Sequence, residues 1–424
     1  MSFITPKLSL FAVIFVNINI MLGTGVFINT VLLTQKVGAF APMLYCIAGF
    51  LMLPLVLSFA RLMTLHKEGS FYSFGSYLSP YWGFISTWSY FIGKLATPTL
   101  GIHVFNLFLQ KSIPFFNSFS VFTLDICIIL LFVFLNLFSG TIGKRIQYVF
   151  LLTKSIPLLF ALGAGLWCFD FINLSAPAIM WEGIPLSLPL VIFCFLGFEA
   201  TCSLSKVIED PQKNASKAIM YSFFIVMALL TFYQFFFYGA LGQLLAEQQN
   251  YVTAFPLLIQ KAFPHLLSIL SPLLSLAIAT SALGGAYGLL YSNAWNLHIL
   301  ATHDHIPFSR LFSECNRYHI PYLCIIFEGF MCICYLALTQ GSQIPLQYTS
   351  VLSCMATHAI SIISLQIMAP SLLSLCGLAS SIIAIFFCVR GFIFTNLMPL
   401  YFFLAILALG TIIYRLKRKS LPSA

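Results

Sequence analysis

The stretch Asn19-Ile20-Met21-Leu22-Gly23-Thr24-Gly25-Val26-Phe27 decides the fold. It lies in an apolar run from about residue 8 to residue 33, and two glycines flank a threonine at its middle. Glycine lets the backbone leave helical geometry, which exposes N–H and C=O groups. At membrane depth such groups are tolerated only where they line a cavity or bind something. The stretch therefore predicts a membrane helix that is broken near its middle.

A second apolar run, at about residues 185–206, has a matching interruption, Phe193-Cys194-Phe195-Leu196-Gly197-Phe198-Glu199-Ala200. Here a glycine stands beside an ionisable residue. Matched interruptions in corresponding helices of two halves are the best sequence indication of a transporter site. The alternative is that these glycines only let helices pack closely. Gly23 and Gly25 are two positions apart, however, and so cannot form one contact face.

The composition requires lipid as the solvent. Of the 424 residues, 60% are hydrophobic and 7% are charged, whereas soluble proteins carry about 25% charged residues. A helix needs about 20 apolar residues to cross a bilayer. The sequence predicts an all-α membrane protein with twelve transmembrane helices. They are expected at about residues 8–33, 38–64, 82–109, 121–139, 146–168, 185–206, 217–243, 267–298, 320–339, 347–369, 372–393 and 396–414.

The basic residues indicate the orientation. Cytoplasmic loops are rich in Lys and Arg. If both termini lie on the cytoplasmic side of the cell's inner (plasma) membrane, most basic residues fall on that side. The outer side receives only Lys36, Lys111, Lys261 and Arg390, and Lys94 and Lys154 fall within spans. The net charge of +9 thus reflects topology and does not indicate nucleic acid.

The other side-chain patterns predict no cofactor and no metal. The twelve cysteines are scattered through apolar segments, so they read as small apolar residues rather than disulfides or zinc ligands. The histidines at positions 298, 303, 305 and 319 are expected to belong to a solvated loop and its borders.

The two breaks fall near the middle of the first helix of each of two five-helix blocks, at residues 8–168 and 185–369. An odd number of helices forces the second block to enter the membrane from the opposite side, which predicts an inverted repeat. Residues 372–414 would add two peripheral helices to a single transporter domain.

The breaks also predict the chemistry of the site. N–H groups left free at the start of the second half-helix would face an anion such as a carboxylate; they belong to Gly23, Thr24 and Gly25. Open carbonyl groups would accept from an ammonium group; they belong to Met21, Phe193 and Leu196. Together these groups suit a zwitterionic α-amino acid.

Several motifs resemble the amino acid–polyamine–organocation (APC) permeases. Gly23-Thr24-Gly25-Val26-Phe27 is similar to the family's first-helix G-[ST]-G-[IV]-F, and Gly197-Phe198-Glu199 to its sixth-helix G-[FY]-E. The loop from Glu209 to Ile219 and the segment from Glu68 to Tyr72 resemble two cytoplasmic loops. The sequence departs from the family at Lys206 and Val207, where acidic residues are common, and at Ser70 and Ser216.

The resemblance implies transport of amino acids or related amines by proton symport or exchange, closest to the basic amino acid/polyamine antiporter branch. It implies that Thr24 and Gly25 hold the substrate carboxylate, beside Gly197, and that Phe193 is an aromatic lid. Glu199 would match the family's intramembrane carboxylate and act with Phe198 in gating or coupling. The aromatic residue that contacts a guanidinium in arginine exchangers has two candidates, Tyr287 and Trp295, so the substrate side chain stays open.

Ionisable residues inside a membrane are functional by default. In Glu199 we expect a protonatable coupling or gating group, or else a hydrogen bond to loosened backbone. Lys154 resembles the lysine that replaces sodium in proton-coupled relatives and would tether helix 5 to helix 1; the alternative is a snorkelling lysine. Lys94 either lines the pocket or pairs with Glu199 or Glu328. His358 is a weaker pocket candidate.

Three other functions compete with transport by a permease. A membrane-embedded enzyme would need clustered catalytic side chains, and a channel needs no paired broken helices. A nutrient sensor built on the transporter fold stays open, as does a homodimer. The expected partners are the lipid bilayer, a small amino acid or amine, and protons.

Overall fold

The computed structural model describes residues 7–66, 69–138, 140–175, 180–249 and 251–419. Glu68, which begins one of the motifs compared above, lies outside these residues. The described part is helical and contains no strand beyond one isolated bridge between Leu8 and Ile208. It is an all-α protein, as predicted.

The helices follow the predicted apolar runs closely. The long helices are α1 (Leu10–Met21), α2 (Gly25–Val37), α3 (Ala41–Leu65), α5 (Pro80–Lys94), α6 (Ala96–Ser112), α7 (Val121–Asn136), α8 (Gly140–Trp167), α10 (Ile184–Phe195), α12 (Pro211–Leu241), α15 (Leu267–Thr302), α17 (Tyr322–Thr339), α18 (Gln343–Met368), α19 (Leu372–Phe394) and α20 (Met398–Lys419). The short ones are α4 (Phe71–Ser76), α9 (Ile172–Ser175), α11 (Ala200–Ser203), α13 (Gln243–Ala246), α14 (Ala254–Ala262) and α16 (Ser309–Phe312).

Local sequence explains where many helices begin. Serine side chains accept hydrogen bonds from the first turns of α1, α4, α5, α7 and α19, which satisfies N–H groups that have no partner within the helix. Prolines open α5 and α12, where their fixed φ and missing N–H cost nothing.

One expected span contains an interruption that the sequence analysis did not predict. The run at residues 82–109 divides at Leu95 into α5 and α6. Pro98 has no N–H to donate to the carbonyl of Lys94, four residues earlier, so the helical ladder is weakened there. The interruption lies directly beside Lys94.

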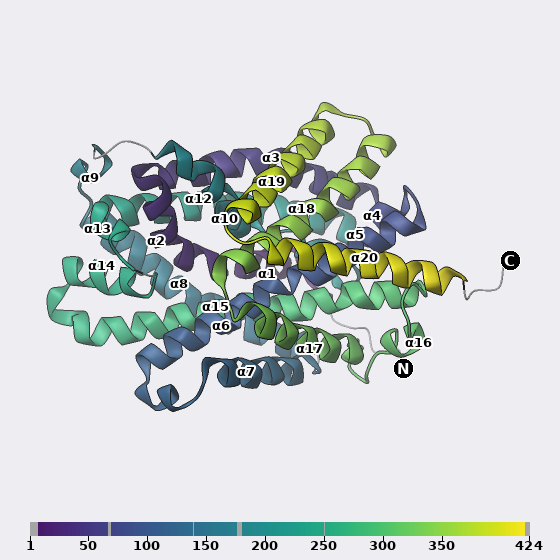
Figure 1. The fold of residues 1–424 in the computed structure, drawn as a ribbon, viewed down its shortest axis with the longest axis horizontal. Helices are drawn as coiled ribbons and strands as arrows, with labels where there is room; N and C mark the ends of the chain where they lie inside the picture. The colour runs from purple at the N-terminus through teal and green to yellow at the C-terminus, as the bar shows by residue number, and fades with distance from the viewer. Residues whose placement is uncertain (1–6, 67–68, 139, 176–179, 250, 420–424) are drawn as a thin grey trace.

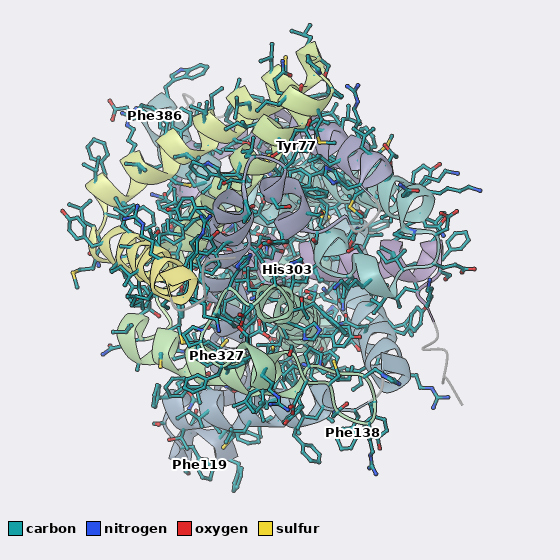
Figure 2. All side chains as sticks on the ribbon, turned by 90° about the vertical axis from the view of Figure 1, so that its right-hand side faces the viewer. Tyr77, Phe119, Phe138, His303, Phe327 and Phe386 are labelled. Carbon is teal, nitrogen blue, oxygen red and sulfur yellow. The ribbon has the colours of Figure 1, made fainter. Side chains whose placement is uncertain are left out.

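Eight helical segments are long and apolar enough to cross a membrane, counting only the described residues and joining α1 to α3 as one segment. The segments over Val121–Asn136 and Trp181–Phe195 are apolar but shorter. Large apolar side chains cover the outside of the molecule, and Figure 2 shows Phe119 and Phe386 projecting from its edge. Such a surface requires a lipid solvent.

The broken helices occupy the centre. Helix α1 packs on α8, α12 and α15, and α10 packs on α2, α3, α18 and α19. Helices α7 and α17 lie at the lower edge of the molecule (Figure 1), and α20, drawn in yellow, lies at the edge in Figure 2. The short helices α9, α13 and α14 gather at one end of the molecule, while α4, α16 and the end of α20 lie at the other (Figure 1).

Candidate functional site

The first break separates α1 from α2. Helix α1 ends at Met21 and α2 begins at Gly25, so residues 22–24 leave the helix between them. The first N–H groups of any helix have no acceptor within it. Most of the break is buried, because Met21 and Thr24 are only 2% and 4% exposed, while Gly23 between them is partly exposed.

The second break separates α10 from α11. Helix α10 ends at Phe195 and α11 begins at Ala200. Gly197 between them has φ +136°, a conformation that only glycine adopts without strain. The carbonyl of Phe193 is not fully open as predicted, because it accepts the N–H of Leu196 at 3.2 Å. A carbonyl has two lone pairs, so one acceptor position remains.

The two breaks contact each other. A Cβ atom added to Gly197 would lie 2.8 Å from Ile20 Cγ2 and 2.9 Å from the backbone nitrogen of Met21. One added to Gly25 would lie 2.8 Å from the sulfur of Cys194. The packing interpretation of these glycines is therefore partly right. The glycines allow close packing at the same place where the helices break. The backbone N–H and C=O groups that leave the two helices therefore lie near each other.

Glu199 closes the second break. Its Oε2 accepts the N–H of Gly197 at 2.6 Å, and its Oε1 lies 2.7 Å from Nζ of Lys94. The hydroxyl of Tyr90 donates to the same Oε1 at 3.3 Å. Glu199 and Lys94 are 0% and 1% exposed. Of the two pairings considered for Lys94, the structure has the one with Glu199.

Lys154 contacts the first break. Its Nζ on α8 donates to the carbonyl of Asn19 at 2.5 Å, near the end of α1. Lys154 is fully buried. Among the described residues, no carboxylate forms an ion pair with it. Lys154 thus joins α8 to α1 through this one hydrogen bond.

Asn19 itself is a site residue that the sequence analysis missed. Its side chain donates to Gln147 of α8 and, at 3.4 Å, to the carbonyl of Gly284 on α15. Two more asparagines hold the half-helices in the same way. Asn17 bonds Thr201 at 2.8 Å, and Asn29 bonds the carbonyl of Leu190 at 2.9 Å. Amides within apolar runs were the available sequence signal, because a buried amide requires partners.

Helix α15 supports the first break with small residues, which were also missed. Its stretch Gly284-Gly285-Ala286-Tyr287-Gly288 approaches residues 19–23 so closely that a Cβ on Gly285 would lie 3.4 Å from Cα of Gly23. One on Gly284 would lie 2.9 Å from Oδ1 of Asn19. Glycines at helical spacing were the sequence signal for this close approach.

The remaining aromatic candidates and His358 pack against other rings. Phe198 is buried against Phe59 and His358, whose rings are 4.5 Å apart. Tyr287 packs instead on Phe132 and Phe150 of α7 and α8. The ring of Trp295 packs edge-on against His298, further towards the end of α15.

Glu328 on α17 differs from Glu199. It is fully buried, yet neither carboxylate oxygen forms a hydrogen bond of good geometry within the described part of the chain. The amide of Asn293 lies nearby but donates to the carbonyl of Phe91 at 2.9 Å. Glu328 was the other candidate partner of Lys94, and among the described residues it forms no ion pair with Lys94 or any other base.

The histidine-rich loop is packed with aromatic residues. Tyr72 stacks on His303 with ring centroids 4.0 Å apart, and its hydroxyl lies 2.7 Å from Nε2 of His305. Within the described residues, no group of three His, Cys, Asp or Glu side chains is arranged to hold a metal ion.

The comparison with known families decides the class of protein. The family model described as "Amino acid permease" matches residues 8–417, which is almost the whole chain. The chain belongs to this family of permeases. Its place within the APC superfamily agrees with the resemblance found at the two breaks, and it favours a transporter over a membrane-embedded enzyme.

A curated relative supports the assignment. The permease is 23% identical over 307 residues to "Amino-acid permease AapA" of Bacillus subtilis (strain 168). The match covers 68% of this chain and 64% of the relative. The match thus spans slightly less than two thirds of that relative's length. The family and the apolar helices together show a multi-pass membrane protein.

Proposed function

We propose that this permease is a secondary transporter of amino acids or related amines that works by alternating access. One observation carries the proposal: Gly197 of the second break packs against Ile20 and Met21 of the first. Two helix interruptions with unpaired backbone groups therefore meet inside the protein. Irregular backbone at this depth is stable only where it is buried or serves a ligand.

The substrate's common part would lie between the breaks. N–H groups at Gly23, Thr24 and Gly25 would hold the carboxylate, since the start of a helix carries partial positive charge. Carbonyl groups at Met21 and Leu196, with the remaining lone pair of Phe193, would accept the ammonium group. Phe193 would close over the substrate, because its ring already contacts the position of Gly25.

Lys154 would couple transport to protons. Its ammonium lies 2.5 Å from the carbonyl of Asn19 and has no ion-pair partner among the described residues. A buried cation without a counter-ion is costly. When Lys154 loses its proton, no ion pair has to break and no partner charge is left unpaired. Glu199 would act as a gate, because it joins the second break to α5 through Lys94.

The topology we propose has twelve spans in two inverted five-helix repeats, residues 8–168 and 185–369, with helices of residues 372–414 at the periphery. Each predicted span coincides with one helix or with two consecutive helices, which supports the count. Both termini would lie on the cytoplasmic side of the plasma (inner) membrane. The gathering of α16 and the end of α20 at one end (Figure 1) supports this orientation.

Uptake of radiolabelled amino acids into proteoliposomes tests the proposal. We expect uptake by vesicles with the permease and none by protein-free vesicles. Amino acid methyl esters and N-acetyl amino acids should both compete poorly, because each removes one of the two charges that the breaks would recognise. Competition by both derivatives as strong as that of the parent amino acid would contradict a zwitterion site.

The same vesicles distinguish the two coupling modes. Symport predicts uptake into empty vesicles that rises when the outside is acidified. Exchange predicts uptake only when the vesicles are preloaded with an amino acid or amine. Absence of uptake under every condition, with ligand binding retained, would favour a nutrient sensor over a transporter.

A further inference from the structure

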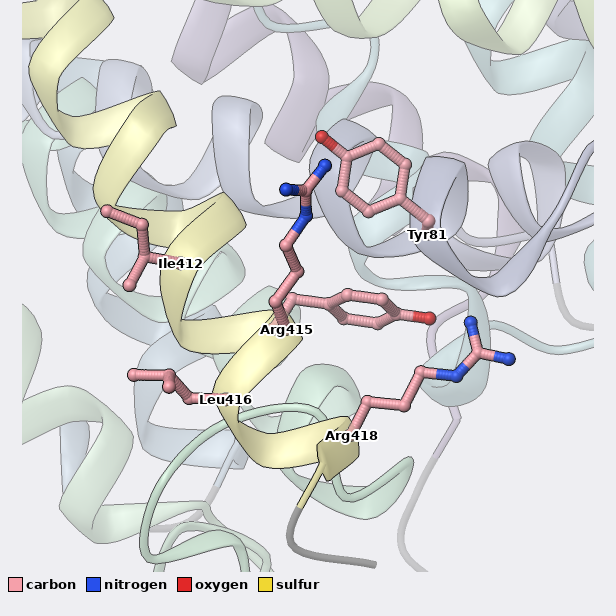
Figure 3. A pocket seen from close by; sticks show the side chains of 6 residues that line it. Tyr81, Ile412, Arg415, Leu416 and Arg418 are labelled. Atoms are coloured by element: carbon pink, nitrogen blue, oxygen red, sulfur yellow. The ribbon is translucent and has the colours of Figure 1, made fainter. Parts of the chain in front are cut away.

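An open groove of about 730 Å³ lies at the end of α20, away from the two breaks. It is lined by Tyr81, Ile412, Tyr414, Arg415, Leu416 and Arg418. Figure 3 shows Arg415 extending towards the ring of Tyr81, with Arg418 one turn further along the helix. Ile412 and Leu416 leave the helix in the opposite direction (Figure 3). The groove thus combines two guanidinium groups with aromatic and aliphatic surface.

The two arginines are available to an anion. Both are exposed, and no acidic side chain within the described residues forms an ion pair with either. Their neighbour Lys417 is engaged by Asp304 at 2.8 Å. The hydrogen bond from Lys417 lowers the pKa of the Asp304 carboxyl, so this acid is already neutralised by another base.

Tyrosines fix the opposite wall of the groove. The hydroxyl of Tyr81 lies 3.2 Å from Oγ1 of Thr411, and its ring packs edge-on against Tyr414. Tyr414 is only 5% exposed and packs on Phe84 and His305. The wall is therefore part of the folded structure and does not depend on a ligand to form.

The groove lies where a membrane-spanning helix ends. Helix α20 is apolar up to Ile413, and its outward side chains Leu404, Leu409 and Ile412 are at least half exposed. Tyrosine and arginine at the end of such a helix are typical of the membrane–water interface. Arginine also matches the geometry of phosphate, since its planar donors bind two oxygens at once.

We propose that this groove binds the phosphate-bearing headgroup of an anionic glycerophospholipid. Arg415 and Arg418 would hold the phosphate, while the acyl chains would lie along the exposed apolar side of α20. The bound lipid would also stabilise an indirect link from α20 to α4 through His305. Tyr414 packs on His305, whose Nε2 lies 2.7 Å from the hydroxyl of Tyr72 at the start of α4.

Lipid binding to the purified full-length protein in neutral detergent tests the proposal without any transport assay. We expect phosphatidylglycerol to raise the unfolding temperature more than phosphatidylcholine does. The double variant Arg415→Gln/Arg418→Gln should bind phosphatidylglycerol about 30-fold more weakly, since each basic residue near an anionic membrane surface contributes about fivefold. Native mass spectrometry would count the bound lipids directly.

Two comparisons keep the result decisive. The variant Lys213→Gln removes an exposed base elsewhere and should leave the affinity unchanged, and Arg415→Lys/Arg418→Lys should retain part of it. Equal affinity of wild type and the double glutamine variant would overturn the proposal, as would equal binding of phosphatidylcholine. Stabilisation by inorganic phosphate as large as that by the lipid would assign the groove to a free anion and would also overturn it.

Discussion

The two helix breaks are built from the same kind of backbone feature but are held by opposite charges. At the first break a cation, Lys154, donates to a carbonyl group of α1 at 2.5 Å. At the second an anion, Glu199, accepts the N–H of Gly197 at 2.6 Å. The second charge is compensated by Lys94, whereas the first has no ion-pair partner in the described structure.

The difference bears on the functions expected of the two residues, which were coupling or gating for Glu199 and a tether in place of sodium for Lys154. A compensated, hydrogen-bonded carboxylate is expected to keep its charge and to hold its surroundings in one arrangement. An uncompensated buried ammonium can lose its proton at lower cost. The comparison therefore favours Lys154 as the coupling group and Glu199 as a structural gate.

Breaking the ion pair of the second site should have the largest effect. Lys94→Met leaves the Glu199 charge buried without its partner, and we expect the free energy of unfolding to fall by about 3–5 kcal/mol. Lys94→Met/Glu199→Gln should recover more than half of that loss, because no unpaired charge remains. Thermal and denaturant unfolding in detergent would measure both.

A matched control uses the partly exposed ion pair between Lys417 and Asp304, whose length of 2.8 Å is close to the 2.7 Å of the buried pair. Lys417→Ala should cost about 1 kcal/mol or less. If the double variant at positions 94 and 199 were no more stable than Lys94→Met, burial of an unpaired charge would not be the cause of the loss.

Gly197→Ala should have the next largest effect. The new methyl group would meet Ile20 and Met21, and the residue would keep φ at +136°. We expect a loss of roughly 2 kcal/mol in stability and a roughly hundredfold loss of uptake, because the two breaks would move apart. Gly163→Ala, which adds a methyl group to open space on α8, should lower neither measurement, because alanine favours a helix more than glycine does.

Asn19→Ala should have a smaller effect, confined to the first break. It removes the bonds to Gln147 and to the carbonyl of Gly284, and we expect a cost of about 1–2 kcal/mol. Hydrogen exchange of residues 19–24 should accelerate, while that of residues 196–200 should stay as in the wild type. Equal acceleration at both breaks would show that they are not held independently.

Lys154→Gln should have the smallest effect on stability and the most specific effect on transport. The amide keeps an N–H donor for the carbonyl of Asn19, so we expect a cost under about 1 kcal/mol. It cannot carry a proton, so an inward proton gradient should no longer stimulate uptake. The exposed Lys213→Gln is the control, and undiminished stimulation in Lys154→Gln would remove this residue from the coupling mechanism.

The sequence predicted the positions of the helices and both breaks because glycine and apolar length are local properties. It could not decide between Glu199 and Glu328 as the partner of Lys94, since that depends on how α5, α10 and α17 pack. The interruption at Leu95 was missed although Pro98 signalled it. Asn19 and the glycines of α15 were missed because their function arises only from contacts across the fold.

The buried pair of Lys94 and Glu199 has an electrical consequence. A membrane potential of 100 mV does about 2.3 kcal/mol of work on each elementary charge that crosses it. The pair has no net charge, so its reorientation during a cycle would transfer almost none. With a zwitterionic substrate, the voltage would act through Lys154 alone: a protonated carrier would move inwards with one positive charge, and the deprotonated carrier would return without an electrical cost.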